Sequence, residues 1–346
     1  MNEIRYTTPS EQIQKLRSQN MIVIDEEYAE EQLFQCGYSN LIKSYRDPYI
    51  FISNGKKMYR SGVTFEQLQS LYTLDKNLRN AVMGAMLDLE EHIKEAAADV
   101  IASSFGVHQD EYLQFRNYRD KSKKKYCFSL AGIIETMKKA LKTDKNPIAH
   151  YSSSHGIVPP WILFKSIYFS TIVNFIHQFK PAEQTKMVKH LYDPNSKIPK
   201  SVLPELMMDT LFVCLEYRNL AAHGGRIYNY ECEKKLRFYQ NPDSSLHGFN
   251  LLLLLLSFFK YKAPLEILEK ALNNELNRHC SAFPEDVTYL GQILNVDITV
   301  RNTVWITNNS QKYHRYKHCS GILNAKGIDI KEADSQGYTP CKKCYK

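Results

Sequence analysis

The sequence predicts a mainly α-helical protein that ends in a small α+β module. Apolar residues recur at the three-to-four-residue spacing of helices through most of the first 285 positions. Several of these runs begin or end at residues that favour helix caps, and no convincing strand alternation precedes residue 290. We therefore expect an N-terminal helical region over residues 1–60, a helical domain over residues 61–285 and a separate module over residues 286–346.

Two short helices are expected near the start of the chain. The stretch "PSEQIQKLRSQNMIV" places Ile13 and Leu16 three residues apart, on one helical face. The stretch "DEEYAEEQLFQCGY" opens with acidic residues, carries Ala29 and Leu33 four residues apart, and closes with Gly37. Both stretches follow the start and stop rules of helices.

A long helix is expected from Thr64. Thr64 and Gln67 have the spacing of a capping box, in which each side chain satisfies a backbone amide of the first turn. Apolar residues then recur at helical spacing as far as Ile101, and Gly106 ends the run. The polar Asp75 leaves a break in this helix open.

Four further helices are expected in the second half of the domain. Pro160 introduces a strongly apolar helix that ends near Lys180, and Pro204 starts the next one, which two glycines end. Two more helices are expected around residues 249–260 and 264–279. The run "LLLLLLSFF" is shorter than the ~20 residues that a membrane span needs, so it predicts a buried core helix and no membrane insertion.

Composition is compatible with nucleic acid as a partner. The chain has a formal net charge of +8 and 23 tyrosines, although a soluble protein with slightly more lysine than usual gives the same numbers. Residues 116–126, "RNYRDKSKKKY", fit either a solvated turn or an RNA contact. The N-terminus lacks the apolar core of a signal peptide and the eight cysteines are spread widely, so we expect a cytoplasmic protein with reduced thiols.

The segment "RNLAAHGGRIYN", residues 218–229, gathers polar side chains at the end of an apolar helix; we call it the 218–229 box. Helical geometry places Asn219 and His223 on one stripe and Arg218 beside them, within an arc of about 140°. Arg226 and Asn229 are expected just past the helix end, near the other three.

These residue types suit cleavage of RNA without a metal ion. Histidine exchanges a proton near neutral pH, so His223 could act on the ribose 2′-hydroxyl or on the leaving 5′-oxygen. The planar, permanently charged guanidinium of Arg218 matches a phosphate. Asn219 could fix the histidine tautomer or cap the local backbone. A structural arginine–histidine pair at a helix end is the alternative that the box alone leaves open.

The box resembles the signature of the HEPN superfamily, and the surrounding chain resembles the Abi-like proteins of bacterial abortive phage-infection systems. The stretches "SEQIQKLRSQNMIVIDEEYAEEQLFQCGYSNLI", "GVTFEQLQSLYTLDKNLRNAVMGAMLDLEEHIKEAAA" and "VPPWILFKSIYFSTIVNFI" precede the box in family order. The resemblance implies a HEPN-like helical bundle and an antiphage toxin that cleaves RNA to 2′,3′-cyclic phosphate and 5′-hydroxyl ends. It makes Arg218, Asn219 and His223 the catalytic residues, with Arg226 and Asn229 in support.

Further expectations come from the same resemblance. Glu90 or Glu91, together with His92, lies on the helix where HEPN proteins often place another polar residue, although an exposed polar face explains these residues at least as well. Because the sequence has no second Arg-x4–6-His motif, a homodimer with one motif from each subunit is implied. Some relatives act with a small non-coding RNA. The alternatives are a non-catalytic protein that holds such an RNA and a protein-interaction scaffold.

The C-terminal module carries residues of a zinc site. Cys341 and Cys344 form a Cys-x-x-Cys pair, and His314 with Cys319 offers the partner pair, with His318 as a competing ligand. The module resembles the zinc-binding domain of the Ada methyl-phosphotriester repair protein, with histidine in place of its first cysteine. We therefore expect a structural Cys₃His zinc ion. The alternatives are a small β module with free thiols, or with a disulfide if the protein is exported. Residues 301–346 carry a charge of +6, which fits either contact with nucleic-acid phosphates or a solvated basic tail.

Overall fold

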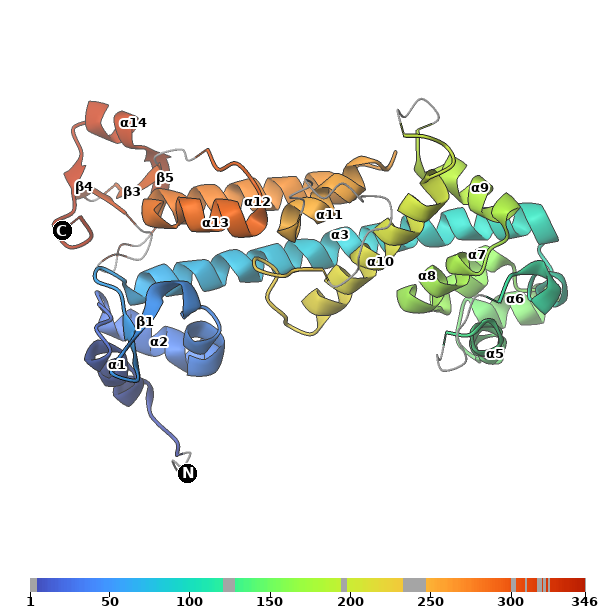
Figure 1. The fold of residues 1–346 in the computed structure, drawn as a ribbon, viewed down its shortest axis with the longest axis horizontal. Helices are drawn as coiled ribbons and strands as arrows, with labels where there is room; N and C mark the ends of the chain where they lie inside the picture. Colours follow the sequence, from blue (N-terminus) through green and yellow to red (C-terminus); the bar gives the residue numbers. More distant parts are fainter. Residues whose placement is uncertain are drawn as a thin grey trace. The chain divides into compact units, whose positions relative to one another are not determined.

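The computed structural model describes residues 5–120, 128–193, 198–232, 247–299, 303–308, 310–315, 319, 322 and 324–345 (Figure 1). Two compact units divide the chain. The terminal unit comprises Met1–Leu78, Ala271–Gln292 and Val296–Lys346. The central unit comprises Arg79–Lys270 and Ile293–Asn295. Each unit is described by itself below.

The terminal unit begins with the two expected short helices, α1 (Pro9–Ser18) and α2 (Glu26–Cys36). Thr8 and Glu11 form a complete capping box at the start of α1. Gly37 ends α2 with a φ of 79°, a left-handed angle that glycine adopts without strain. A π-helical turn (Ser39–Lys43) and a 3₁₀ turn (Asp47–Tyr49) follow.

A β-hairpin comes next, so the expectation of no strand before residue 290 is wrong. Strand β1 (Ile50–Ser53) pairs antiparallel with β2 (Lys56–Tyr59). The two turn residues, Asn54 and Gly55, have φ angles of 48° and 74°, as asparagine and glycine allow in a tight hairpin. Period-two alternation is missing from the sequence because most of the hairpin is exposed on both faces.

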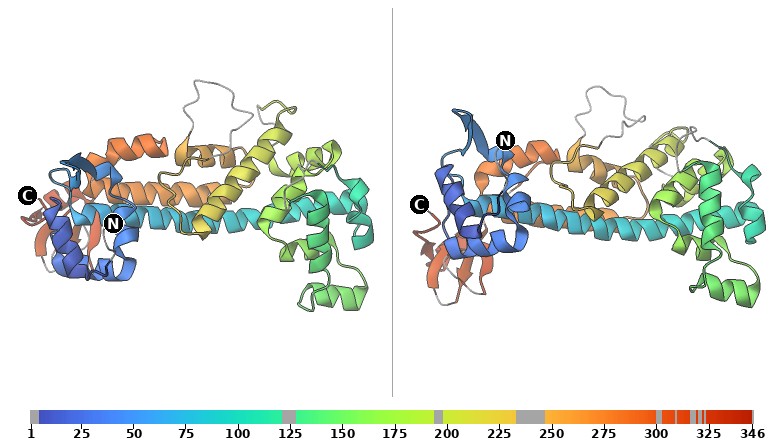
Figure 2. Two further views of the ribbon diagram at one scale, coloured as in Figure 1. Left: turned by 60° about the horizontal axis from the view of Figure 1, so that its bottom comes forward. Right: turned by 90° about the horizontal axis from the view of Figure 1, so that it is seen from below.

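Helix α3 (Phe65–Phe105) is continuous, so the break left open at Asp75 does not occur (Figure 2). Asp75 is fully buried, and its carboxylate accepts a hydrogen bond from Tyr45 Oη at 2.6 Å. This hydrogen bond offsets part of the cost of burying the Asp75 carboxylate, so the helix continues through this position. Thr64 Oγ1 accepts from Gln67 N at 3.1 Å as expected, but the Gln67 side chain turns to Asp286 instead of closing the capping box.

Asp286 is the centre of a buried polar network in the terminal unit. It accepts from Tyr49 Oη at 2.7 Å and from Gln67 Nε2 at 3.1 Å, and it lies 2.9 Å from Nε2 of the fully buried His279. His279 Nδ1 lies 2.9 Å from Ser70 Oγ. The network joins α3 to the end of α12 (Ala263–Ala282) and to the 3₁₀ turn that follows α12.

A small sheet completes the terminal unit, after helix α13 (Val287–Leu294), which forms where the sequence turns rich in β-branched residues. The strand order is β5-β3-β4-β6, with only β4 and β6 parallel. Helix α14 packs on the sheet through its buried Ala333, over Val304, Ile306, Tyr313 and Ile328. The predicted class, mainly α with a small C-terminal α+β module, is confirmed. The bounds are β3 (Thr303–Thr307), β4 (Ser310–His314), β5 (Lys326–Asp329), α14 (Ile330–Ser335) and β6 (Thr339–Pro340).

The central unit is built from the second part of α3 and a series of helices. The apolar helix expected from Pro160 to near Lys180 is interrupted, since Ile167 and Tyr168 have extended backbone angles. Ile167 is buried, so its packing overrides the helical pattern of the sequence. The helices are α4 (Gln109–Tyr112), α5 (Leu130–Ala140), α6 (Ile148–His155), α7 (Pro160–Leu163), α8 (Phe169–His177), α9 (Pro181–Leu191), α10 (Leu203–Ala222) and α11 (Gly248–Ser257).

Two further expectations concern this unit. Residues 121–126 of the basic 116–126 stretch lie outside the described residues, and a 3₁₀ turn occupies Phe115–Asn117. Among the described helices, none combines the length and apolar character needed to cross a membrane.

Candidate nucleic-acid site and candidate metal centre

Helix α10 positions the start of the 218–229 box. Pro204 lies in its first turn, where a missing amide hydrogen does not matter. The first half of the helix is buried almost all round, and it packs against α8, α9 and α11. Tyr217, fully buried one residue before the box, donates to Gly248 O at 3.0 Å. Burial raises the pKa of the Tyr217 hydroxyl, so it remains a neutral donor.

The helix ends in a Schellman motif that follows His223. Gly224 N donates to Ala221 O at 3.2 Å, and Gly225 N donates to Leu220 O at 2.8 Å. Gly224 has a φ of 72°, which explains the first glycine. A Cβ on Gly225 would overlap the Leu220 side chain and lie 3.1 Å from the Leu220 carbonyl oxygen, so glycine also suits position 225. The glycine pair therefore fixes the direction in which the chain leaves His223.

Two side chains hold the segment that follows. Arg79 of α3, which sequence analysis did not single out, donates from Nη1 to Gly224 O at 3.0 Å and to Gly225 O at 3.3 Å. Glu216 Oε2 accepts from Tyr230 Oη at 3.1 Å and from Cys232 Sγ at 2.8 Å. The glycine pair within the box is thus tied to α3, and the chain that follows the box is tied back to α10.

Arg218 carries a donor that the described residues do not satisfy. Its Nη1 lies 3.4 Å from Asn219 Oδ1, a long contact between neighbours. Its Nε is buried and has no hydrogen-bond partner among the described residues. Because buried donors are nearly always paired in folded proteins, this atom calls for an acceptor beyond the residues that the structure describes.

His223 is the C-cap of α10 and is exposed, whereas Arg218 and Asn219 are half-buried in the last turns of the helix. Arg226 and Asn229 are half-buried in the segment after the helix, on either side of the buried Ile227 and Tyr228. The five box residues chosen from the sequence therefore lie on one helix end and its returning loop.

Glu91 lies elsewhere along α3. Its side chain is exposed, and its charge acts on Tyr261, which precedes α12. Tyr261 Oη donates to Asp88 Oδ1 at 2.8 Å, and its ring stacks on His92 with centroids 4.5 Å apart. Glu90 instead pairs with Lys94 at 2.7 Å. Asp88, Glu91 and His92 thus surround Tyr261, whereas Arg79 of α3 contacts the box.

The C-terminal module brings a second set of predicted residues together. The ligand atoms of His314, Cys319, Cys341 and Cys344 lie within 4.8 Å of one another, and all four residues are buried. The competing ligand, His318, lies outside the described residues. This cluster could hold a metal ion.

The geometry of the cluster fits a tetrahedral cation. Cys319 Sγ lies 3.9 Å from Cys341 Sγ, and Cys344 Sγ lies 3.9 Å from His314 Nδ1. A zinc–sulfur bond of ~2.3 Å in a tetrahedron gives a sulfur–sulfur distance of about 3.8 Å. The backbone amides of Arg315 and Lys343 lie 3.4 Å from the sulfurs of Cys344 and Cys341, where they would stabilise thiolates.

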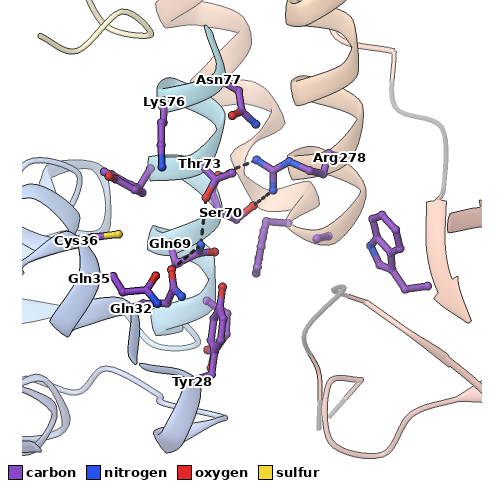
Figure 3. Close-up of a pocket in the computed structure, with 15 residues that line it drawn as sticks. Tyr28, Gln32, Gln35, Cys36, Gln69, Ser70, Thr73, Lys76, Asn77 and Arg278 are labelled. Atoms are coloured by element: carbon purple, nitrogen blue, oxygen red, sulfur yellow. Dashed lines mark hydrogen bonds between the residues drawn. The ribbon is translucent and has the colours of Figure 1, made fainter. Parts of the chain in front are cut away.

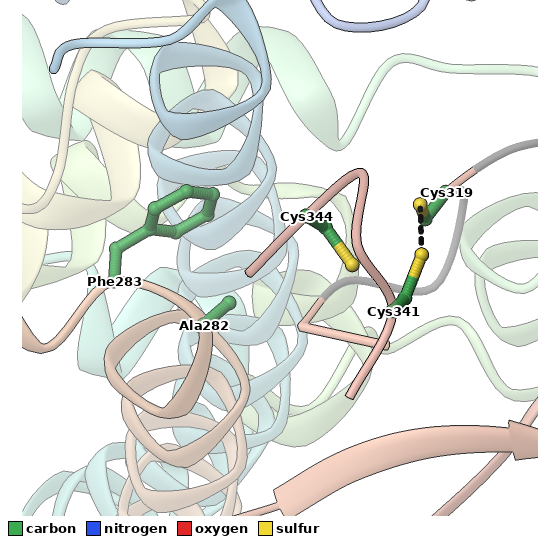
Figure 4. Close-up of a cluster of buried hydrophobic side chains, with 5 residues drawn as sticks. All are labelled: Ala282, Phe283, Cys319, Cys341 and Cys344. Carbon is green, nitrogen blue, oxygen red and sulfur yellow. Dashed lines mark hydrogen bonds between the residues drawn. The ribbon is translucent and has the colours of Figure 1, made fainter. Parts of the chain in front are cut away.

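The cluster packs against the end of α12. Cys319, Cys341 and Cys344 form one buried group with Ala282 and Phe283 (Figure 4). Arg315 lies over the Phe283 ring, 5.3 Å from its centroid, donates to the Ala282 carbonyl and pairs with Glu285 at 2.9 Å. The cluster therefore fastens the C-terminal module to the rest of the terminal unit.

Comparison with known proteins identifies the family. A model of the family described as Abi-like protein matches residues 31–229, from within α2 to the last residue of the 218–229 box. No curated protein and no solved structure matches the chain. Because the family match covers more than half of the sequence, the chain belongs to the Abi-like protein family.

Proposed function

We propose that this protein is an antiphage abortive-infection effector that cuts RNA as a metal-independent HEPN-type endoribonuclease. Membership of the Abi-like family suggests a role in abortive infection. One observation supports the cleavage site most strongly: the exposed imidazole of His223 shares one helix end with the buried Nε of Arg218, which has no partner within the described part of the chain. That pair offers a phosphate-binding cation beside a proton carrier.

The reaction follows from these groups. His223 takes the proton of a ribose 2′-hydroxyl, and the 2′-oxygen attacks the adjacent phosphorus. The bond from phosphorus to the 5′-oxygen breaks, and that oxygen receives a proton from an acid. The products are a 2′,3′-cyclic phosphate and a free 5′-hydroxyl. Arg218 holds the phosphate and stabilises the charge that grows on its oxygens.

A homodimer supplies the second proton carrier. One box contains one histidine, whereas the reaction needs a base and an acid. Two copies of His223 facing one scissile phosphate fill both roles, and two copies of Arg218 surround its charge. Exposure of His223 at the end of α10 leaves it accessible to a second copy.

The remaining box residues support this site. Asn219 lies beside Arg218 and orients it through the contact at 3.4 Å. Arg226 and Asn229, on the returning loop, bind flanking phosphate or ribose groups. Glu91 would belong to an RNA-contacting surface only if RNA extends along α3. A small non-coding RNA could bind the same surface as a regulator.

Replacing His223 tests the function. His223→Ala should lower the cleavage rate of labelled RNA by about 10²–10⁴-fold, the usual contribution of a general acid or base. His155→Ala is the matched control, because His155 is also exposed in the last turn of a helix and precedes a left-handed glycine. Equal cleavage by wild type and His223→Ala would refute the assignment. RNA binding without cleavage in both would support the alternative, a protein that only holds RNA.

The C-terminal cluster is proposed to bind a structural zinc ion. His314, Cys319, Cys341 and Cys344 fill the four positions of a tetrahedral site and leave none open for substrate. The thiolates that zinc requires persist in a reducing compartment, in keeping with a cytoplasmic protein. Purified protein should contain one zinc per chain by elemental analysis, and Cys341→Ser should lose it while Cys36→Ser keeps it. Full zinc content in Cys341→Ser would contradict the site.

A further inference from the structure

A cavity of about 450 Å³ lies in the terminal unit, and its lining includes no residue of the 218–229 box and no ligand residue of the metal cluster. Side chains of α2, α3 and α12 surround it (Figure 3), and β3 of the C-terminal module adds Trp305. Its volume lies within the range of ~300–1,000 Å³ that is common for small-molecule sites.

Flat aromatic side chains line part of the cavity. Trp305 of β3 joins Tyr28, Tyr72 and Phe283 there. On the neighbouring strand, Gly327 lies opposite Trp305, and a Cβ at that position would lie 3.5 Å from the indole ring and 3.1 Å from Thr303 Cγ2. Such a Cβ would make an ordinary contact with the indole, so the glycine relieves crowding against Thr303 and not against the ring. The four aromatic side chains favour a flat ligand ring that stacks on them.

Polar groups that both donate and accept lie beside these rings. Four amide side chains line the cavity, and Gln69 Nε2 donates to Thr73 Oγ1 at 3.1 Å. Glu66 Oε1 accepts from the backbone amides of Ile24 and Asp25, each at 3.1 Å, whereas Glu66 Oε2 is buried without a partner among the described residues. This mixture matches the edge of a nucleobase. The four amides are Gln32, Gln35, Gln69 and Asn77.

The charges at the cavity point to an anionic group on the ligand. Arg278 is already neutralised, because it pairs with Glu275 at 2.8 Å and donates to Ser70 Oγ at 2.9 Å. Lys76 is exposed, lines the cavity and has no ion-pair partner among the residues that the structure describes. An ammonium group without a partner suits a phosphate.

We propose that this cavity binds a nucleotide, with the base between the aromatic and amide side chains and the phosphate at Lys76. A free mononucleotide and the terminal nucleotide of an RNA strand present the same chemistry. Because Trp305 comes from the C-terminal module, binding would couple that module to α2, α3 and α12. The site is distinct from the proposed cleavage site and does not depend on it.

Tryptophan fluorescence tests the proposal. The chain has two tryptophans, and Trp161→Phe leaves Trp305 as the reporter at the cavity. Excited at 295 nm, this variant is titrated with AMP, GMP, CMP and UMP, and with a 5′-phosphorylated, fully 2′-O-methylated trinucleotide that the proposed reaction cannot cut. Saturable quenching is expected with at least one probe. Saturation by mononucleotides identifies a free nucleotide, and saturation by the trinucleotide alone identifies an RNA end.

Variants locate the binding. Lys76→Ala should weaken nucleotide binding about tenfold, the loss of one contact between charged groups, and bring it close to the affinity of the matching nucleoside. Lys57→Ala, an exposed lysine of β2 that does not line the cavity, should bind as wild type does. His223→Ala should also retain full binding, which separates this result from the cleavage assay. Absence of saturable quenching with every probe, or equal loss in both lysine variants, would overturn the proposal.

Discussion

Arg218→Met tests whether the arginine is kept for function at the expense of stability. A buried donor without a partner destabilises the folded state by about 1–3 kcal/mol, and Nε of Arg218 is such a donor among the described residues. The hydrogen bond to Asn219 that the change removes is long, at 3.4 Å. Methionine retains the apolar packing of the arginine stem. We expect a variant that is about 1 kcal/mol more stable than wild type and inactive on RNA.

The same substitution at Arg79 is the matched control. Its guanidinium donates to the carbonyls of Gly224 and Gly225, so Arg79→Met should lower the free energy of unfolding by about 1–2 kcal/mol. Urea unfolding followed through Trp161, in a Trp305→Phe background, reports on both changes within the central unit. If Arg218→Met loses more than about 1 kcal/mol, the arginine stabilises the fold, and the inference that it awaits RNA is refuted.

Three further predictions concern stability. Asp286→Ala should lower the free energy of unfolding in urea by about 3–5 kcal/mol, because three buried donors lose their acceptor. The control Asp334→Ala, at an exposed position, should change it by under about 0.5 kcal/mol. Similar values for the two variants would refute the stabilising role of the network. Gly224→Ala should lower the melting temperature more than Gly224→Asn, since asparagine tolerates the left-handed φ; the reverse order would contradict the Schellman geometry. Burial lowers the pKa of His92 from 6.5, so the unfolded state binds the proton more tightly and the free energy of unfolding should fall as the pH drops below 6.5. His92→Phe should make the free energy of unfolding depend less steeply on pH in this acid range. An unchanged pH dependence would contradict the lowered pKa.

The helix that carries the box was predictable because its signals are local. Pro204 and the glycine pair mark the two ends of α10, which begins one residue before Pro204 and ends two residues before Gly224. The metal quartet was also visible, since a Cys-x-x-Cys pair brings two thiols together whatever the fold. His314 and Cys319 lie close together in the sequence ahead of this pair, and they were predicted as the other two ligands.

Contacts between distant segments were not predictable. Arg79 reaches Gly224 across 145 positions of sequence, and no pattern near Arg79 announces the contact. Gln67 has the spacing of a capping residue, yet it donates to Asp286, 219 positions away. The hairpin did carry a local signal, the Asn54-Gly55 dipeptide, but the strands on either side of it lack an alternating apolar pattern.

The requirement for the 2′-hydroxyl tests the proposed reaction most directly. An RNA whose cleavage position has been mapped is resynthesised with one 2′-deoxynucleotide immediately before that linkage. Wild-type protein in the presence of a chelator should leave the modified linkage intact while it still cuts unmodified RNA to 2′,3′-cyclic phosphate ends. Cleavage at the deoxy position, or products with a 3′-hydroxyl and a 5′-phosphate, would contradict the role assigned to His223 and Arg218.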